Sequence, residues 1–415
     1  MTEFTTESFA EQTVFLTGST GGLGGCLLYQ LAVQLPTKKI FVLCRGSQQN
    51  AIAKWTENMG PCADAILASN KIVFAVGDIL LPNFGLSQLD LDILRRETSV
   101  IIHSAASIAL NSTLTDAIQQ NCLPCLELAR MAASFCRLKL LVQTSTAYVN
   151  TFLPDGPVLE KIYEIAEHDH DPEQELQHIL STGVHPNTTQ YAWPYAHAKH
   201  LMERLLHHRH RTLPLLIVRP SIIGPAIRHP FPHYGPPGSN PASTFVRVLL
   251  ASDPEPNPMV FHVPQGRTSG SNILDEVPVD YVANTTLLHV AAGSVGVVHA
   301  GAQLYVARTL DNLLGALQAG SAKTGRRRQL PEIVFSADYT VEQCFLAELF
   351  RVCTRDWRFD CRRSVGFKEM EMEMEGGDGG LGALSLKMDG HDIDRFGDER
   401  VRRIANKVAA LRARL

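Results

Sequence analysis

A glycine-rich turn near the N-terminus constrains the fold more than any other feature. Residues 13–25 read TVFLTGSTGGLGG, in which an apolar run of β-strand type stops at Gly18 and a helical pattern begins at Leu23. Glycine lets the backbone approach a diphosphate closely, and the free N–H groups at the start of a helix bind it. The stretch therefore predicts a strand, a tight turn and a helix that form a dinucleotide site, rather than a plain glycine-rich loop. The residues predicted to line this site are Thr17, Gly18, Ser19, Thr20, Gly21, Gly22, Leu23 and Gly24.

Composition limits the classes of protein to consider. The 415 residues are 45% hydrophobic and 19% charged, which suits one large domain with a smaller one, or two domains. The formal net charge of -4 gives no reason to expect nucleic acid or an anionic membrane as the main partner. Residues 1–12 are polar, and no run of about 18 apolar residues occurs, so we expect neither a signal peptide nor a membrane span. The scattered cysteines favour reduced thiols in an intracellular protein.

Strands and helices alternate from residue 13 to residue 148. Apolar runs predict strands at 39–45, 71–77, 99–103 and 138–144, and a helical stretch at 114–135. Nearly all-apolar strands that alternate with helices are typical of a parallel sheet covered on both faces. We therefore predict an α/β fold with a doubly wound parallel sheet.

The residues that follow these strands are candidate ligand contacts, because such sheets bind ligands at the carboxyl ends of their strands. Arg45 ends the second strand, where an acidic residue would hold a ribose 2′-hydroxyl and an arginine suits a 2′-phosphate, so NADPH is predicted rather than NADH. Asp78, followed by Ile79, lies where the adenine ring is expected. His103 is interpreted as a buried packing residue. Room for the cofactor after the fourth strand is predicted at Ser104, Ala105 and Ala106.

Two sets of residues resemble metal ligands, and we predict a metal site at neither. Cys122 and Cys125 form a C-x-x-C pair without a second pair or a histidine cluster, so we interpret them as packing residues. Acids and histidines alternate at residues 168–171 within a polar insertion at 151–190, but they lack the i, i+4 spacing of a helical site. Helical patterns inside this insertion lie at 158–166 and 173–180.

The helix predicted at 191–210 carries the candidate chemistry. Tyr195 and Lys199 are four residues apart and share one face of this helix. A lysine near a phenol lowers the pKa of the phenol, which can then exchange a proton with a carbonyl oxygen near neutral pH. The fifth strand ends in Ser145 and Thr146, whose hydroxyls are further candidates.

These motifs together resemble a known family. GSTGGLG, Ser145 and Thr146, and YAHAK at 195–199 resemble the extended short-chain dehydrogenases/reductases, which have a Rossmann-type sheet. KKIFVLCRG, VIIHSAASIAL, STAYVN and LPLLIVRPSIIGPA more narrowly resemble the fatty acyl-CoA reductases, also called male-sterility-type NAD-binding proteins. That family is similar in turn to the thioester reductase domains of carboxylic acid reductases and of peptide and polyketide synthetases.

The resemblance implies roles for individual residues. Tyr195 would donate a proton to the substrate oxygen, and Lys199 would hold the nicotinamide ribose. A hydroxyl of Ser145 or of Thr146 would bind the same oxygen, and the resemblance leaves both open. Contacts to the pyrophosphate, the 2′-phosphate and the adenine would come from the glycine turn, Arg45 and Asp78. Contacts to the nicotinamide amide would come from Pro220 and Ser221.

The resemblance also sets the expected domains. A flexible segment (1–12) would precede a Rossmann-type NADP-binding domain (13–300), whose insertions at 151–190 and 225–275 line the substrate cleft. A smaller, mostly helical substrate-binding region (301–415) would follow, with a flexible linker at 369–380. Its last helix, with apolar residues from 401 to 415, is expected to dock on a core or a partner.

We therefore expect an NADPH-dependent reductase of an acyl thioester, carried by CoA or an acyl carrier protein, that yields an aldehyde or the primary alcohol. The alternatives are a dehydrogenase or epimerase for a sugar nucleotide or a steroid-like alcohol, and a binding protein that has lost catalysis.

TGRRR at 324–328 is either a contact for a CoA or phosphopantetheine phosphate or a solvated loop. The ending Ala413, Arg414 and Leu415 weakly resembles a peroxisomal signal, and a cytoplasmic location is favoured over it. No pattern indicates an oligomeric state.

Overall fold

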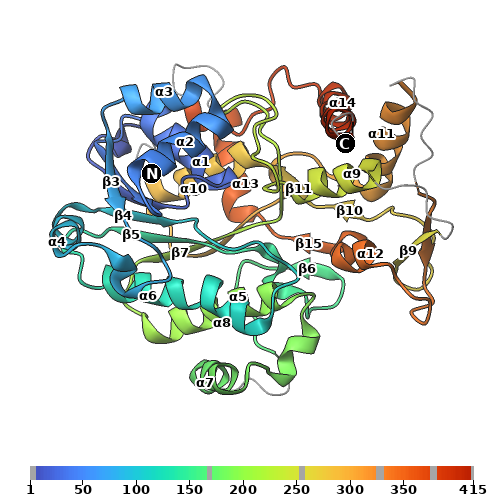
Figure 1. The fold of residues 1–415 in the computed structure, drawn as a ribbon, viewed down its shortest axis with the longest axis horizontal. Coiled ribbons are helices and arrows are strands. Elements are labelled where there is room, and N and C mark those ends of the chain that lie inside the picture. Colours follow the sequence, from blue (N-terminus) through green and yellow to red (C-terminus); the bar gives the residue numbers. More distant parts are fainter. Residues whose placement is uncertain (1–5, 166–170, 252–257, 324–330, 374–380, 413–415) are drawn as a thin grey trace.

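A seven-stranded sheet forms the centre of the computed structural model, which describes residues 6–165, 171–251, 258–323, 331–373 and 381–412 (Figure 1). Every pairing in this sheet is parallel, in the order β12-β7-β5-β4-β1-β2-β3. The α/β class predicted from the sequence is thereby confirmed. The strands are β1 (Thr13–Thr17), β2 (Lys39–Cys44), β3 (Ile72–Val76), β4 (Val100–His103), β5 (Leu140–Thr144), β7 (Leu215–Pro220) and β12 (Gly296–Ala300).

Helices cover both faces of the sheet, which explains why its strands are apolar throughout. Along β1, Val14 and Leu16 pack into one buried cluster, whereas Phe15 packs into the cluster on the opposite face. The first cluster includes α1 (Gly22–Tyr29), α2 (Gln48–Met59), α3 (Pro61–Ala68) and α10 (Val279–Ala291). The second includes α4 (Gln88–Glu97), α5 (Leu114–Asn121), α6 (Leu123–Ala132), α7 (Pro172–Thr182) and α8 (Pro194–Arg209).

A third buried cluster fills the other side of the molecule, where Figure 1 shows α9, α11 and α12. Its helices are α9 (Pro241–Ala251), α11 (Leu310–Lys323), α12 (Phe345–Leu349) and α14 (Ile393–Arg412). Short paired strands join them: β6 (Gly156–Val158), β8 (Ile222–Gly224), β9 (Met259–His262), β10 (Ile273–Leu274), β11 (Glu276–Pro278), β13 (Arg308–Thr309), β14 (Ile333–Ser336) and β15 (Trp357–Phe359). α14 buries Val401 and Val408 against this cluster, as its apolar spacing predicts.

Several boundaries differ from those expected. Thr6–Phe9 forms a 3-10 turn whose Phe9 is buried, so the prediction of a flexible segment over 1–12 is wrong there. The stretch 114–135 is two helices, because α5 ends at Asn121 and α6 begins at Leu123. No helix forms at 159–165: Val158 ends β6, and the carbonyl oxygens of Lys161 and Tyr163 accept hydrogen bonds from the side chains of Arg219 and His200.

The expected linker at 369–380 is also wrong in its first part. Residues 369–373 belong to α13 (Arg362–Glu373), which packs on the sheet core rather than on the third cluster. Residues 374–380 lie outside the described residues. Among the helices that the structure describes, none is both long enough and apolar enough to cross a bilayer.

Candidate active site

The glycine turn has the geometry that its sequence predicts. Gly18 follows β1 with a φ of +77°, and a Cβ there would lie 2.6 Å from the backbone nitrogen of Ala105, which follows β4. A Cβ on Gly24 would lie 2.1 Å from the carbonyl oxygen of Gly18. Only glycine fits at these two positions, because the strand, the turn and the helix touch through their backbones.

The start of α1 is open to a ligand. Its N-cap residue, Gly21, provides no side-chain cap, and residues 20–24 line a cavity of about 810 Å³. The strand order reverses between β1 and β4, the position at which doubly wound sheets bind dinucleotides. The residues present therefore fit a dinucleotide whose diphosphate lies at the start of α1.

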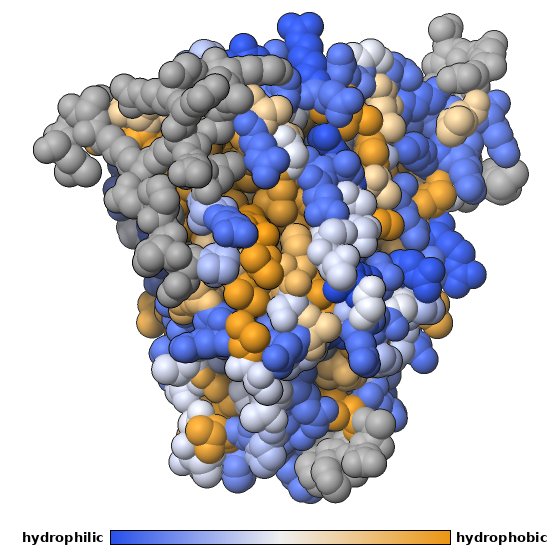
Figure 2. Space-filling model, turned by 90° about the vertical axis from the view of Figure 1, so that its right-hand side faces the viewer, coloured by the Kyte–Doolittle hydropathy of each residue, from blue (hydrophilic) through white to orange (hydrophobic). Residues whose placement is uncertain are grey.

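The cavity extends from the glycine turn, past the predicted catalytic residues, to the third cluster. Figure 2 views the side of the molecule that carries α9, α11 and α12, and it shows apolar side chains gathered in a band between hydrophilic margins. The predicted residues that the cavity brings together are Gly18, Thr20, Gly21, Gly22, Leu23, Gly24, Ser104, Ala106, Ser145, Thr146, Tyr195, Lys199, Pro220 and Ser221.

Tyr195 and Lys199 lie in the first turns of α8, close to the end of β5. The Lys199 Nζ donates a hydrogen bond to the carbonyl oxygen of Thr144 at 3.1 Å. Burial lowers the pKa of Lys199. The expectation that the lysine lowers the pKa of Tyr195 is not met in this structure, because burial, reinforced by nearby Cys125, raises it. A phenol with a raised pKa keeps its proton at neutral pH and is suited to donate it.

Ser145 and Thr146 both line the cavity, but their hydroxyls have different surroundings. The backbone N–H of Tyr148 donates to Thr146 Oγ1 at 3.3 Å. The Ser145 Oγ is buried without a protein partner among the described residues. Both residues are fixed at the end of β5, where the N–H of Ser145 donates to the carbonyl oxygen of Val218 at 2.7 Å.

Other predicted cofactor residues lie at the same edge of the sheet but outside the walls of the cavity. Arg45 follows β2 and is exposed, and Asp78 and Ile79 follow β3. Ser19 is buried within the glycine turn, and Ala105 closely approaches Gly18. Thr17 closes β1, and its hydroxyl hydrogen-bonds to His103 Nδ1 at 2.8 Å.

His103 is a packing residue, as interpreted from the sequence. Its ring stacks on Phe84, and burial, with a smaller effect of Lys199, lowers its pKa to about 3. Cys122 and Cys125 are likewise buried in the second cluster, and burial raises the pKa of both thiols, so they are unreactive.

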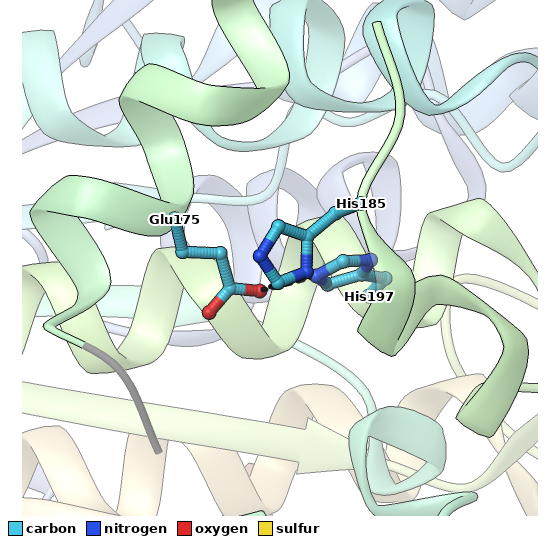
Figure 3. A group of neighbouring side chains, drawn as sticks. All are labelled: Glu175, His185 and His197. Atoms are coloured by element: carbon cyan, nitrogen blue, oxygen red, sulfur yellow. Dashed lines mark hydrogen bonds and ion pairs between the residues drawn. The ribbon is translucent and has the colours of Figure 1, made fainter. Parts of the chain in front are cut away.

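One group of potential metal ligands occurs in the described part of the chain: Glu175, His185 and His197 (Figure 3). Glu175 Oε1 lies 2.5 Å from His197 Nε2, a direct hydrogen bond that leaves no room for an ion between them. Arg204 donates to the other carboxylate oxygen at 2.6 Å, and Thr188 Oγ1 lies 3.1 Å from His197 Nδ1. We interpret the group as an ion-pair network that fastens α7 to α8.

Burial would raise the pKa of Glu175, but the hydrogen bond from His197 and the charges of His197 and Arg204 outweigh it and hold the pKa at about 2. Of residues 168–171, only Asp171 is described, and it caps α7 by accepting from the N–H of Glu173 at 3.0 Å. TGRRR and the last three residues also lie outside the described residues.

The sequence did not identify the far wall of the cavity. This wall is apolar and comes from segments distant in the sequence, so no local motif marks it. Of the two insertions expected to line the cleft, residues 225–275 contribute to this wall, whereas none of the described residues of 151–190 lines the cavity. Its residues are Ala242, Phe245, Leu274, Leu310, Leu313, Phe345, Leu349, Phe350, Val352 and Cys353.

The fold and the site together define a nicotinamide-dinucleotide-binding protein with the extended short-chain dehydrogenase/reductase architecture. More specifically, the chain belongs to the male sterility protein family, whose NAD-binding domain matches residues 16–286. The resemblance stated from the sequence motifs is thereby confirmed.

Curated relatives include Fatty acyl-CoA reductase 1 of Xenopus laevis, 27% identical over 300 residues, which are 68% of this chain and 55% of that protein. The same enzyme of Rattus norvegicus is 28% identical over 301 residues, with the same shares. The chain therefore spans about half the length of the curated relatives it matches.

Two solved reductase domains share the fold. The terminal R domain of the myxalamid PKS-NRPS pathway has a TM-score of 0.59 at 21% identity, covering 97% of this chain and 92% of that one. The reductase domain of a Mycobacterium tuberculosis nonribosomal peptide synthetase has a TM-score of 0.61 at 17% identity, covering 96% of each chain. UDP-glucuronic acid 4-epimerase from Bacillus cereus is similar too, with a TM-score of 0.57 at 13% identity over 96% of this chain and 99% of that one. At these identities the likeness concerns the fold alone.

Proposed function

We propose that this protein is an NADPH-dependent reductase that converts an acyl thioester, carried by CoA or by an acyl carrier protein, to an aldehyde or to the primary alcohol. The supporting observation is one cavity that joins the glycine turn to Tyr195 and Lys199 and then continues between apolar walls. The curated fatty acyl-CoA reductases that the chain resembles agree with this assignment.

The residues of the site have separate tasks. The nicotinamide cofactor, when bound, supplies a hydride. Tyr195 donates its phenolic proton to the carbonyl oxygen of the thioester, and a hydroxyl of Ser145 or Thr146 donates a hydrogen bond to the same oxygen. Lys199 provides a positive charge beside the ribose and the phenol. The hemithioacetal that results then collapses: its C–S bond breaks, the C=O bond re-forms, and the hydroxyl proton passes to the departing thiolate. One hydride and one proton are consumed in all, and the products are an aldehyde and a free thiol.

The preference for NADPH is part of this proposal and is supported by Arg45. It follows β2 with an exposed guanidinium at the edge of the sheet where the adenosine ribose of such cofactors lies. A guanidinium binds a phosphate through paired hydrogen bonds and has no comparable partner in a 2′-hydroxyl.

The walls of the cavity favour an acyl substrate over a sugar nucleotide. Lys199 is the only charged residue among the described residues that line it. A nucleotide sugar would need donors for its two phosphates next to the sugar, whereas an acyl chain needs apolar surroundings. The intact Tyr195 and Lys199 pair also disfavours a binding protein without catalysis.

The test is consumption of NADPH by the purified protein with acyl-CoAs of graded length and with matching acyl carrier proteins, while released thiol is measured and the products are identified. We expect thiol release together with aldehyde or alcohol, and both are lost in the variant Tyr195→Phe. Absence of thiol release from every thioester, or turnover of free ketones and alcohols alone, would overturn the proposal in favour of a dehydrogenase.

A further inference from the structure

Two aromatic side chains form part of the apolar wall of the cavity. Phe350 is 8% exposed and lines the cavity together with Phe245 of α9, and their ring centroids are 5.0 Å apart. Behind them the ring of Phe261 packs edge-on against Phe245 at 6.1 Å, and Phe335 packs against Phe261 at 6.2 Å. Phe261 and Phe335 do not line the cavity. The pair formed by Phe245 and Phe350 therefore separates the cavity from the aromatic rings behind it, and we call this pair the floor of the cavity.

The backbone beneath this floor is held firmly. Phe350 connects α12 to a 3-10 turn at Arg351–Thr354. The Asn272 side chain donates to the carbonyl oxygen of Cys353 at 2.6 Å, and Arg267 donates to that of Thr354 at 2.9 Å. The Thr354 hydroxyl donates to the carbonyl oxygen of His262 at 2.7 Å. The floor therefore cannot recede without breaking buried hydrogen bonds, which is unfavourable.

The same turn is linked to the catalytic helix. The Arg351 guanidinium donates to the carbonyl oxygen of Ala192, immediately before the N-cap of α8. This hydrogen bond links the turn next to Phe350 to the start of α8, the helix that carries Tyr195. By contrast, Phe345, in the first turn of α12, is 67% exposed and lines the cavity at its solvent side.

We propose that Phe350, packed against Phe245, sets the maximum length of the acyl chain that this protein reduces. The inference rests on the proposed function. An acyl chain whose thioester carbon meets Tyr195 extends between the apolar walls until its end reaches the two rings. Phe350 lies beyond residues 16–286, the part that matches the family, so the length limit belongs to this chain's own C-terminal region.

The experiment compares kcat/KM across acyl-CoAs of graded length for the wild type and for Phe350→Ala, which opens the floor. Each additional CH₂ that enters apolar surroundings gives roughly a fourfold gain in affinity. We therefore expect the optimum to move to chains longer by about two carbons, with a gain on the order of tenfold for those chains relative to the original optimum. Phe350→Trp, which raises the floor, should shift the optimum to shorter chains.

The control is Phe335→Ala. Phe335 belongs to the same aromatic group but does not line the cavity, so its replacement should leave the optimal acyl length unchanged. If Phe350→Ala does not fold, Phe350→Leu and Phe350→Trp provide the comparison. An unchanged optimum in the Phe350 variants, or an equal shift in Phe335→Ala, overturns the inference while the proposed function stands. A wild type that reduces no thioester overturns the proposed function instead.

Discussion

The cofactor side and the substrate side of the cavity are built in different ways. On the cofactor side, the surface is largely backbone: the glycine turn after β1, the start of α1 and the small residues after β4. On the substrate side, the surface consists of apolar side chains from α9, α11, α12 and the turn after α12. A backbone surface demands a particular local sequence, whereas an apolar wall accepts many sequences of similar volume. Substitutions on the cofactor side should affect all substrates alike, and those on the substrate side should change the preference among them.

The largest expected effect comes from Tyr195, where the two sides meet. Replacement by Phe removes the proton donor, and loss of a general acid typically costs about 10²–10⁴-fold in turnover. The loss should be equal for acyl chains of every length, while the affinity for NADPH, measured by fluorescence titration, stays unchanged. Turnover equal to that of the wild type would show that another group donates the proton.

The second effect isolates the backbone contact at Gly18. In Gly18→Ala the new methyl group meets the backbone of Ala105, so we expect the Kd for NADPH to rise on the order of 100-fold. Gly266→Ala is the matched control, because Gly266 also has a positive φ, of +86°, but no atom of the described residues lies within 4 Å of its Cβ position. Both variants carry the backbone strain of about 1–2 kcal/mol, and only the first carries the clash. Equal Kd values for the two variants would contradict the importance of the backbone contact at Gly18 for cofactor binding.

The third prediction concerns Glu175, which belongs to neither side of the cavity. Its pKa of about 2 lies below the unfolded value of 4.5, so its stabilisation is complete above pH 4.5 and is lost as the pH falls toward 2. Glu175→Gln should lower the free energy of unfolding at pH 7 by about 3 kcal/mol and flatten its dependence on pH in that range. Both changes are measured by urea unfolding.

The control for this variant lies on the same helix. Glu173→Gln removes the partly exposed ion pair with Arg209 and should cost at most about 1 kcal/mol. In both variants the preferred acyl length should not change. A shift in acyl preference with Glu175→Gln would show that α7 influences the substrate side.

The smallest expected effect is at Arg45. Arg45→Ala should raise the KM for NADPH by about tenfold, which corresponds to the loss of roughly one charge-assisted hydrogen bond. The KM for NADH should stay unchanged. Acyl preference should stay the same, because Arg45 lies outside the cavity walls. An equal effect on both cofactors would contradict a contact with the 2′-phosphate.

The difference between the two sides also explains how far the sequence was informative. The glycine turn and the pair formed by Tyr195 and Lys199 are encoded within short segments, so the pair could be singled out from its spacing together with the glycine turn and the strand that precede it. The strands β1 to β5 were predictable because burial on both faces requires continuous apolar runs, whereas no strand was predicted at β12. Phe245 and Phe350 could not be found in this way, because their contact joins residues that are far apart in the chain and each looks locally like an ordinary helix residue.

Two predictions were wrong because they were made from local patterns. The pattern at 158–166 resembles a helix, but Val158 pairs with Phe359 of β15, and the carbonyl oxygens of Lys161 and Tyr163 accept hydrogen bonds from Arg219 and His200. At Tyr195 burial raises the pKa, where the nearby lysine was expected to lower it. Both the contacts of residues 158–165 and the burial of Tyr195 depend on the whole fold, which a short stretch of sequence does not contain.

The path of the chain after the floor of the cavity limits how this protein can be recombined with its relatives. After β15 the chain returns to the sheet, where Arg363 of α13 donates to the carbonyl oxygens of Val295 and Val297, and the Ser364 hydroxyl hydrogen-bonds to His289 of α10. It then crosses again to place α14 against α9. A chimaeric protein that joins the N-terminal part of one relative to the C-terminal part of another at a single junction would therefore separate α13 from the sheet that it covers. Substrate preference should therefore be changed by substituting individual side chains rather than by exchanging whole segments between relatives.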